Sequence, residues 1–418
     1  MSSSIHATAP RPFSASATPA LATRMAALSG EGALDVFIRA RALEQSGRPV
    51  AHLELGEPDF PTPPHVLEAG IAALRDGATR YSAPAGLPEL RAAVAVDLTA
   101  HGIPADAEQI LITPGAKTML FYAALATIRP GDDVLVPDPG FPIYPSVTRF
   151  CGGTPVPYGL VESDGFAPDV DEIAARLTPR TRVLFLNAPH NPTGGGADRA
   201  VLERLAELAE AHDFMVISDE VYAHITYDGA PRAPSIAGLP GLGPRTIVVD
   251  GFSKRFAMTG WRLGFGLLPH AIVERATTLA VNGHTCTPAF VQRAGVAALR
   301  GPESARRNMI PEYRRRRDRV VAGLEAIDDV HCATPRGAFY AFPSVAPVLA
   351  RAGCTTEQFA ERLLEEHGVA TLAGTAFGAG GAGHLRLSFA ASDETIDRAL
   401  AGIRDATESL AATTGAHP

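Results

Sequence analysis

Lys254 is the residue whose surroundings carry the most chemical information. It lies in the segment Val-Asp-Gly-Phe-Ser-Lys-Arg-Phe-Ala-Met-Thr-Gly-Trp-Arg at 249–262. The run from Ile247 to Val249 predicts a buried strand that ends just before a turn of small residues. A lysine beside the Ser253 hydroxyl and the Arg262 cation suits a Schiff-base amine next to a phosphate, because such an amine must lose its proton to react. For the lysine alone, a solvent-exposed position after a strand is the alternative.

Six further motifs occur in order along the chain. They are Leu-Gly-Glu-Pro-Asp-Phe at 55–60, Tyr-Ser-Ala-Pro-Ala-Gly-Leu-Pro-Glu-Leu-Arg at 81–91, Pro-Gly-Ala-Lys at 114–117, Asn-Ala-Pro-His-Asn-Pro-Thr-Gly at 187–194, Ser-Asp-Glu-Val-Tyr at 218–222 and His-Leu-Arg-Leu-Ser-Phe at 384–389. With the lysine segment, they resemble the class I/II aminotransferases that depend on pyridoxal phosphate (PLP), prokaryotic aspartate aminotransferases among them. The resemblance extends from about residue 24 to 410. It implies the α/β fold type I of PLP transferases, in which helices flank a mostly parallel sheet and a smaller α/β domain follows.

Composition narrows the class of protein. A chain of 418 residues favours two domains, and 46% hydrophobic with 20% charged residues is ordinary for a globular protein. The net charge of −8 argues against nucleic-acid binding. No apolar stretch is long enough to span a membrane. The four cysteines lack CxxC spacing, which argues against disulfides and a metal site and favours a reducing compartment, so we expect a cytoplasmic protein.

Strand-like runs alternate with helical stretches from about residue 66 to 270. This alternation predicts a largely parallel sheet with helices on both faces. Ligands bind beyond the carboxyl ends of the strands in such sheets, and Gly115, Asn187, Asp219 and Lys254 all fall there. This agreement rests on the pattern alone. The predicted strands are Gln109–Thr113, Asp133–Pro137, Arg182–Leu186, Met215–Asp219 and Thr246–Asp250.

We expect four segments along the chain. Residues 1–29 are rich in Ser, Ala, Thr and Pro and contain no acidic residue, which predicts a disordered tail, with an organelle transit peptide as the alternative. Residues 63–300 form the large PLP-binding domain and residues 301–418 a small C-terminal domain, with which residues 30–62 pack in the family. The elements expected in the small domain are helices over 303–324 and 356–367, strands at 338–342 and 384–389, a glycine-rich loop at 374–383 and a final helix.

The start of a predicted helix at Gly115 and Ala116 suits a phosphate, because helix N-termini offer free N–H groups and a favourable dipole. A plain strand-to-helix turn is the alternative. The resemblance adds Ser253 and Arg262 as phosphate ligands and places Lys117 beside the cofactor. It also implies that Tyr81 reaches the phosphate of a second subunit, which makes the active unit a homodimer. A surface tyrosine before a turn is the alternative for this residue.

Asp219 ends the apolar run that begins at Met215 and should therefore be buried. A buried carboxylate is costly unless it is paired, and the N–H of a protonated pyridine ring would pair it. An aspartate that caps the next helix is the alternative. The resemblance implies that Tyr222 and Asn191 hydrogen-bond the 3-oxygen of the cofactor ring. It places Phe141 over the ring face, where a core phenylalanine is the alternative.

Arg386 matches the family arginine that binds the substrate's α-carboxylate, for which a guanidinium fork is suited. An exposed arginine in an edge strand is the alternative. The resemblance implies accessory contacts from Asn187 and the backbone of Gly56. Lys117 aligns with a lysine that meets a distal carboxylate in some prokaryotic aspartate aminotransferases.

Two departures from the family pattern bear on specificity. Ala373-Gly374-Thr375 replaces Pro-Gly-Thr, and Gly30-Glu31-Gly32-Ala33 replaces Pro-Ser-Xaa-Thr, so Ala33 stands where those enzymes carry a threonine. We expect an aminotransferase in which Lys254, assisted by Asp219 and Tyr222, moves the α-proton. The substrates are an L-amino acid, with aspartate and glutamate favoured, and a 2-oxo acid such as 2-oxoglutarate. Aromatic or aliphatic donors, a PLP-dependent lyase or oxidase, and a non-catalytic PLP-binding regulator are the alternatives.

Overall fold

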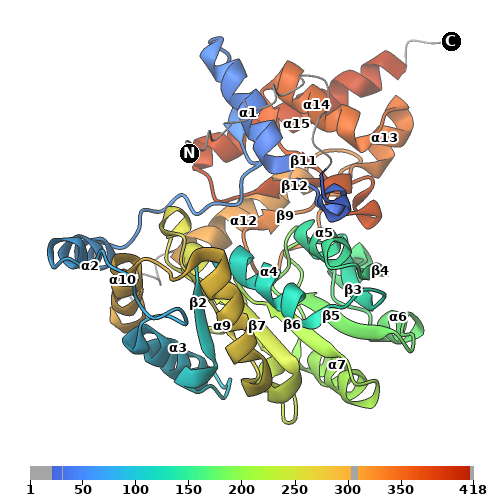
Figure 1. The fold of residues 1–418 in the computed structure, drawn as a ribbon. Helices are drawn as coiled ribbons and strands as arrows, with labels where there is room; N and C mark the ends of the chain where they lie inside the picture. The colour runs from blue at the N-terminus through green and yellow to red at the C-terminus, as the bar shows by residue number, and fades with distance from the viewer. Residues whose placement is uncertain (1–20, 31, 303–308, 415–418) are drawn as a thin grey trace, which may run out of the picture.

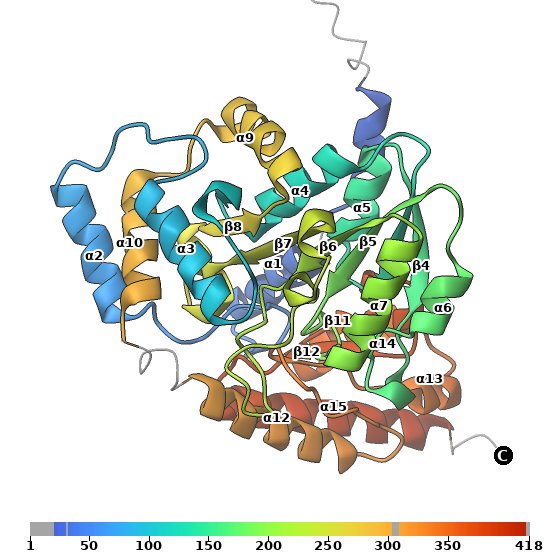
Figure 2. The same cartoon turned by 90° about the horizontal axis from the view of Figure 1, so that it is seen from below.

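A computed structural model describes residues 21–30, 32–302 and 309–414. Its largest element is a seven-stranded sheet in the order β2-β8-β7-β6-β5-β3-β4 (Figures 1 and 2). β8 runs antiparallel to both of its neighbours, β2 and β7, and all other neighbouring strands of this sheet are parallel. The bounds are β2 (Ile110–Thr113), β3 (Asp133–Asp138), β4 (Thr154–Gly159), β5 (Thr181–Asn187), β6 (Met215–Asp219), β7 (Thr246–Gly251) and β8 (Gly264–Leu267).

Successive residues of the central strands face opposite sides of the sheet, and both sides are covered. Val183 and Phe185 of β5 pack with α4, α5 and α9, whereas Leu184 and Leu186 pack with α6 and α7. Parallel strands that are buried on both faces consist of continuous apolar runs, as here. The helices around the sheet are α2 (Pro64–Arg75), α3 (Pro88–Ala100), α4 (Ala116–Thr127), α5 (Ile143–Phe150), α6 (Val170–Ala175), α7 (Arg199–Ala211), α8 (Phe252–Arg255), α9 (His270–His284) and α10 (Ala289–Arg300).

All five strands predicted for the large sheet form, β6 at its predicted bounds and the others within one residue of theirs. Two strands of this sheet escaped prediction because their residues disfavour strands. Pro155 and Pro157 lie in β4, which tolerates them because it is an edge strand that pairs only with β3. Two glycines, Gly264 and Gly266, leave β8 with little strand propensity.

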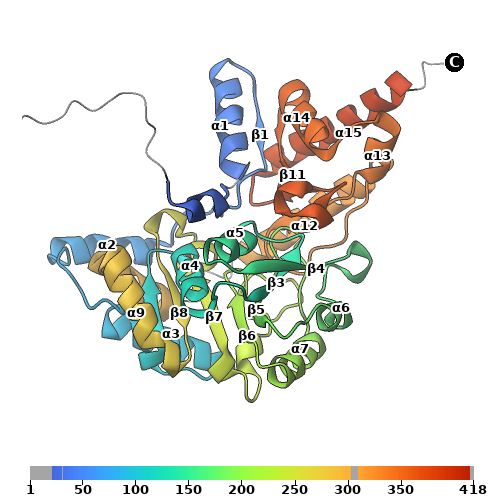
Figure 3. The same cartoon turned by 45° about the vertical axis from the view of Figure 1, so that its right-hand side comes forward.

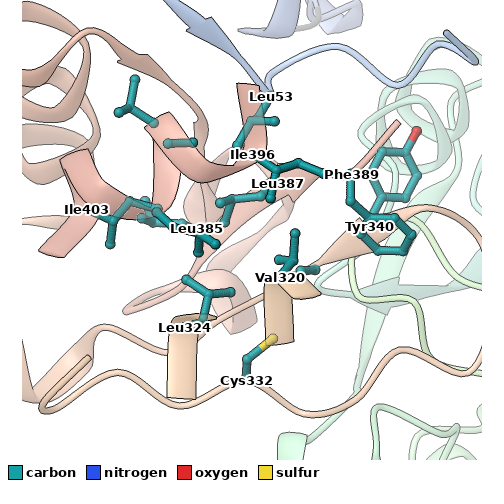
Figure 4. Close-up of a cluster of buried hydrophobic side chains, with 14 of the residues drawn as sticks. Leu53, Val320, Leu324, Cys332, Tyr340, Leu385, Leu387, Phe389, Ile396 and Ile403 are labelled. Carbon is teal, nitrogen blue, oxygen red and sulfur yellow. The ribbon is translucent and has the colours of Figure 1, made fainter. Parts of the chain in front are cut away.

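The C-terminal part of the chain forms a second core above the carboxyl ends of the large sheet (Figures 1 and 3). Its sheet has the order β11-β12-β9 and is antiparallel. Leu385 and Leu387 of β12 are buried in a cluster with Val320, Leu324 and other apolar side chains (Figure 4). The elements are α12 (Met309–Glu325), β9 (Tyr340–Ala341), α13 (Ala346–Ala352), α14 (Thr356–His367), β10 (Val369–Ala370), β11 (Leu372–Ala373), β12 (Leu385–Ser388) and α15 (Asp393–Thr414).

The N-terminal segment packs on this second core. β1 (Ala51–His52) pairs in parallel with β10, and α1 (Gly32–Gln45) places Ala40 against Leu364 of α14. Figure 3 shows α1 and β1 beside α14 and β11. These contacts support the expected association of residues 30–62 with the C-terminal part, and the division into domains remains a prediction.

Two predicted segments extend beyond the described residues. The helix expected to start at Glu303 is described from Met309 onwards, and residues 1–20 of the expected tail lie outside the described part. Thr23–Ala27 form the short helix η1, in which Arg24 lies 5.9 Å from the ring centroid of Phe150. The other 3-10 helices are η2 (Ala107–Gln109), η3 (Glu162–Asp164), η4 (Ile236–Gly238), η5 (Gly243–Arg245), η6 (Thr259–Trp261), η7 (Gly374–Phe377) and η8 (Ala379–Gly381).

Candidate active site

A cavity of about 630 Å³ lies at the carboxyl ends of β5, β6 and β7, where the C-terminal part meets the large sheet. A chain that crosses from one strand to the next leaves polar loop residues at this edge. The structure brings twelve of the predicted site residues to its walls: Gly56, Ala116, Lys117, Phe141, Asn187, Asn191, Asp219, Tyr222, Ser253, Lys254, Arg262 and Arg386.

Lys254 extends into this cavity from α8, the single helical turn that follows β7. Its ammonium group donates a hydrogen bond to the Gly56 carbonyl oxygen. The pKa of Lys254 is lowered from 10.5 to about 8, chiefly because burial disfavours the charged amine; Glu57 opposes this shift, and nearby cations, Arg386 first among them, add to it. A deprotonated amine is therefore accessible to this lysine close to neutral pH, as nucleophilic or general-base chemistry requires.

Asp219 is the last residue of β6, and 3% of its surface is exposed. The Tyr144 hydroxyl donates to one carboxylate oxygen at 2.9 Å, and the Val221 N–H lies 3.4 Å from the other. Burial raises the pKa of Asp219 from 3.8 to about 6 because these neutral donors do not replace the lost water. A cation bound in the cavity would therefore stabilise the ionised form of this buried carboxylate.

Asn187 and Asn191 link the backbone of Asp219 to Arg386. The Asn187 amide nitrogen donates to the Asp219 carbonyl at 2.8 Å, and its oxygen accepts from the Asn191 N–H at 2.9 Å. The Asn191 oxygen in turn accepts from Arg386 at 3.2 Å. Asn187, expected as a substrate contact, thus directs both polar ends of its amide into the protein.

The start of α4 and the guanidinium of Arg262 form a corner suited to an anion. Gly115 precedes α4 with φ +87°, and a Cβ added there would lie 2.4 Å from the Arg262 Nη2 atom, so this close approach requires glycine. Arg262 donates to the Thr259 carbonyl at 2.9 Å, and no ion pair found among the described residues includes it. Its charge and the free N–H groups of α4 therefore remain for an anion.

Arg386 lies on β12, the central strand of the C-terminal sheet, and is 4% exposed. The edge-strand alternative is therefore wrong. Its guanidinium carbon lies 4.7 Å from the ring centroid of Tyr340 and 4.9 Å from that of Phe377. One nitrogen also donates to the Glu54 carbonyl oxygen. These contacts fix the plane of the guanidinium beside the cavity.

Phe141 and Tyr81 have different surroundings. Phe141 lines the cavity, with its ring centroid 5.4 Å from the Lys117 ammonium and its edge against Tyr144. Tyr81 is 88% exposed and is not among the residues that line this cavity in the single chain. Its expected role in a second subunit remains a prediction.

Two tyrosines that contact the predicted site residues were missed from sequence. Tyr144 lies three residues after Phe141 near the start of α5, and the two rings meet at an interplanar angle of 83°. No local pattern indicates its hydrogen bond to Asp219, which lies 75 residues further along the chain. Tyr340 contacts Tyr222 across 118 residues of sequence, and no local pattern indicates such a pair.

The comparison with known protein families assigns this chain to one of them. The model of aminotransferases of class I and II matches residues 48–403. This chain is a member of the class I and II aminotransferases. This chain is 36% identical over 397 residues to an aspartate aminotransferase of Rhizobium meliloti, and the match covers 93% of this chain and 96% of the relative. It is 38% identical to an arginine–pyruvate transaminase of Pseudomonas aeruginosa, covering 90% and 95%.

A solved structure gives the same fold. The aminotransferase superposes on the Thermus thermophilus aspartate aminotransferase with maleate at a TM-score of 0.86 and 36% identity, covering 93% of this chain and all of the other. The predicted fold class and the predicted aminotransferase activity are thereby confirmed. The cited relatives are named for transamination, which favours it over the lyase, oxidase and non-catalytic alternatives.

Two kinds of feature are absent from the described part of the chain. No helix in it is long and apolar enough to cross a membrane. It also contains no group of three or more His, Cys, Asp or Glu side chains placed to hold a metal ion.

Proposed function

We propose that this aminotransferase depends on PLP and transfers the amino group of an L-amino acid, with aspartate and glutamate as favoured donors, to a 2-oxo acid such as 2-oxoglutarate. One observation carries the proposal. A single cavity holds an amine with a pKa of about 8 (Lys254), a buried carboxylate with a raised pKa (Asp219) and a buried guanidinium (Arg386). Family membership supports the cofactor, since these enzymes are PLP-dependent.

The residues around the cavity fit PLP in charge and shape. The phosphate would lie against the Gly115–Ala116 backbone, the Ser253 hydroxyl and Arg262, where a Cβ at Gly115 would clash. The ring nitrogen would face Asp219, whose pKa is raised by burial and which a protonated ring nitrogen would stabilise in its charged form. Bound PLP supplies a ring that withdraws electrons from the substrate's α-carbon. The other proposed ring contacts are Phe141 on one face and Tyr222 and Asn191 at the 3-oxygen.

Each charged side chain then has a defined task. Lys254 accepts the proton from the α-carbon and later returns it, and its lowered pKa suits both roles near neutral pH. Arg386 binds the α-carboxylate, because its stacked and hydrogen-bonded guanidinium is already oriented. The Gly56 carbonyl oxygen accepts a hydrogen bond from the Lys254 ammonium and so directs it into the cavity.

Lys117 supports the choice of acidic donors. It lines the cavity on α4, with its ammonium 5.4 Å from the centroid of the Phe141 ring. A positive charge there is complementary to the distal carboxylate of aspartate or glutamate. Maleate, named with the Thermus thermophilus relative, is also a dicarboxylate.

Aromatic or aliphatic donors are the second candidate. Ala33, Leu34 and Leu120 line the same cavity and offer apolar surface to a substrate side chain. The Pseudomonas aeruginosa relative is named for arginine and pyruvate, so similar chains differ in their donors.

Assembly and location are part of the proposal. We infer a homodimer in which Tyr81 of each subunit completes the phosphate site of the other, which would bury a tyrosine that is 88% exposed in the single chain. A cytoplasmic location is supported by the four cysteines, all of which are free.

A donor screen tests the proposal. Purified protein loaded with PLP is mixed with one amino acid at a time, without a 2-oxo acid, and its absorbance is followed through a single turnover. We expect the fastest change with glutamate and aspartate. If the absorbance does not change with any of the amino acids, the proposed activity is wrong. If it changes fastest with phenylalanine or leucine, only the preference for acidic donors is wrong.

A further inference from the structure

Tyr340 contacts two parts of the cavity that lie far apart in the sequence, Tyr222 and Arg386. It is the first residue of β9, is 1% exposed and lines the cavity. In Figure 4 it lies at one end of the apolar cluster, far from Leu324 and Ile403. Its backbone is therefore fixed in the C-terminal sheet, where Tyr340 pairs with Ser388 of β12.

The hydroxyl of Tyr340 reaches the loop that follows β6. The Tyr222 and Tyr340 hydroxyl oxygens are 2.6 Å apart and buried, and the two rings meet edge to face. A Cβ added to Gly56 would lie 1.8 Å from the Tyr340 oxygen, so the backbone that accepts the Lys254 hydrogen bond packs directly on this hydroxyl. The hydroxyl has little room to turn away from Tyr222.

The ring of Tyr340 contacts the other functional group. The Arg386 guanidinium carbon lies 4.7 Å from its centroid, within the range of a cation–π interaction. Phe377 covers the guanidinium at 4.9 Å as well. One side chain thus meets Tyr222 through its hydroxyl and Arg386 through its ring.

We propose that Tyr340 is a positioning residue that couples the Arg386 guanidinium to the Tyr222 hydroxyl. Its side chain sets the positions of both groups together, the one that binds the substrate carboxylate and the one at the cofactor's 3-oxygen. This inference rests on the proposed function, because it assigns Tyr222 to the cofactor and Arg386 to the substrate. A hydroxyl that accepts a hydrogen bond becomes a better donor itself. Tyr340 as donor to Tyr222 therefore strengthens the hydrogen bond that Tyr222 gives to an anionic ring oxygen.

The state of Tyr222 agrees with this role. Burial raises the pKa of Tyr222 well above 10, and its neighbour Tyr340 raises it further. Tyr222 therefore stays protonated and remains a donor across the working range of pH. The hydroxyl and the ring of Tyr340 make separate contacts, so two substitutions separate their effects.

The test compares Tyr340→Phe and Tyr340→Leu with Tyr158→Phe as the control. Tyr158 loses an equivalent buried hydrogen bond, 2.8 Å long to the Phe185 carbonyl, and does not line the cavity. All variants are loaded with PLP, and the midpoint of the pH-dependent absorbance change is measured with kcat and KM for the best wild-type donor. Circular dichroism and Tm of the cofactor-free proteins establish folding.

Tyr340→Phe should raise the absorbance midpoint by on the order of half a pH unit, because a weaker Tyr222 donor stabilises the anionic ring oxygen less. Its kcat should fall several-fold with KM within about two-fold, since Arg386 keeps an aromatic neighbour. Tyr340→Leu should in addition raise KM about ten-fold, because the guanidinium loses that ring. Tyr158→Phe should match wild type in both the midpoint and KM.

A Tyr340→Phe protein that keeps the wild-type midpoint and kcat would overturn the inference, and so would a Tyr340→Leu protein with an unchanged KM. If Tyr340→Leu does not fold, Tyr340→Phe decides alone. Wild-type protein that processes no amino acid refutes the proposed function instead, so the two failures are distinguishable.

Discussion

Asp219→Asn should make the cofactor-free protein more stable while it removes the activity. The side chain keeps its size, and the Asn oxygen can still accept the Tyr144 hydroxyl that now lies 2.9 Å from the carboxylate. What disappears is a negative charge held in a buried position, where burial raises the pKa from 3.8 to about 6. Residues that serve binding or catalysis commonly cost stability in this way.

The magnitude follows from that pKa. Each tenfold change in proton affinity is worth about 1.4 kcal/mol, so keeping Asp219 ionised in the folded, cofactor-free protein costs about 3 kcal/mol. Between about pH 4 and pH 6 the folded protein holds this proton more tightly than the unfolded chain, so stability falls as pH rises and then levels off. Asparagine has no such dependence. The free energy of unfolding of Asp219→Asn should therefore exceed that of the wild type by about 3 kcal/mol at pH 8 and by roughly half as much at pH 5.

Urea unfolding of the PLP-free protein, followed by circular dichroism at pH 5 and pH 8, measures this difference. Asp133→Asn is the matched control, because Asp133 is equally buried but lies 3.0 Å from the cation of Arg180, and its loss should not stabilise the fold. Activity of Asp219→Asn with PLP should fall by several orders of magnitude, since charge partners in a dry site are worth several kcal/mol. The reasoning fails if Asp219→Asn gains no stability at pH 8, or gains the same amount at both pH values.

Three further predictions concern the cavity and the assembly. Borohydride should fix PLP onto Lys254 and not onto Lys117, and peptide mapping that finds the label elsewhere refutes the assignment. Labelling of the PLP-free protein by a small aldehyde should rise around pH 8, where the Lys254 pKa lies. Lys117→Ala should raise KM about ten-fold or more for aspartate and glutamate but not for alanine or phenylalanine, because a lost contact to a charged group costs about 1.5–3 kcal/mol; an equal effect on all donors would make Lys117 structural. Tyr81→Phe should raise the Kd for PLP without dissociating the dimer in light scattering, and a fully active monomer would exclude a shared site.

The fold and most of the cavity were predictable from sequence because both follow from local patterns. Apolar runs such as Val183–Leu186 specify strands buried on both faces, and a chain that leaves such a strand must place its next polar residue at one edge of the sheet. Asn187, Asp219 and Lys254 were identified in this way before any contact was known.

Contacts between distant segments were not predictable. Tyr144 donates to Asp219 across 75 residues and Tyr340 meets Tyr222 across 118, and nothing near either tyrosine distinguishes it from a core residue. The resemblance gave positions for the cofactor and substrate groups, but it did not give the side chains that hold those groups in place. β4 was missed because its prolines are acceptable only on an edge, and edge position is a property of the whole sheet.

Composition, once combined with the structure, adds an argument for Lys117 that neither gives alone. Only two of the 37 lysine and arginine residues are lysines, Lys117 and Lys254, and both line the same cavity. Elsewhere the chain uses arginine for its cations, as in the ion pairs that Arg39 forms with Glu361 and Glu365 on the surface.

Arginine offers a permanent, planar charge, whereas lysine offers a compact charge on a flexible stem and an amine that can lose its proton. Lys254 needs the second property in the proposed mechanism. Lys117 lies with its ammonium against the face of Phe141, on the helix whose start would bind phosphate. A compact charge at this place matches the distal carboxylate of a short dicarboxylate, which is the contact proposed for it, and the Lys117→Ala measurement tests that contact.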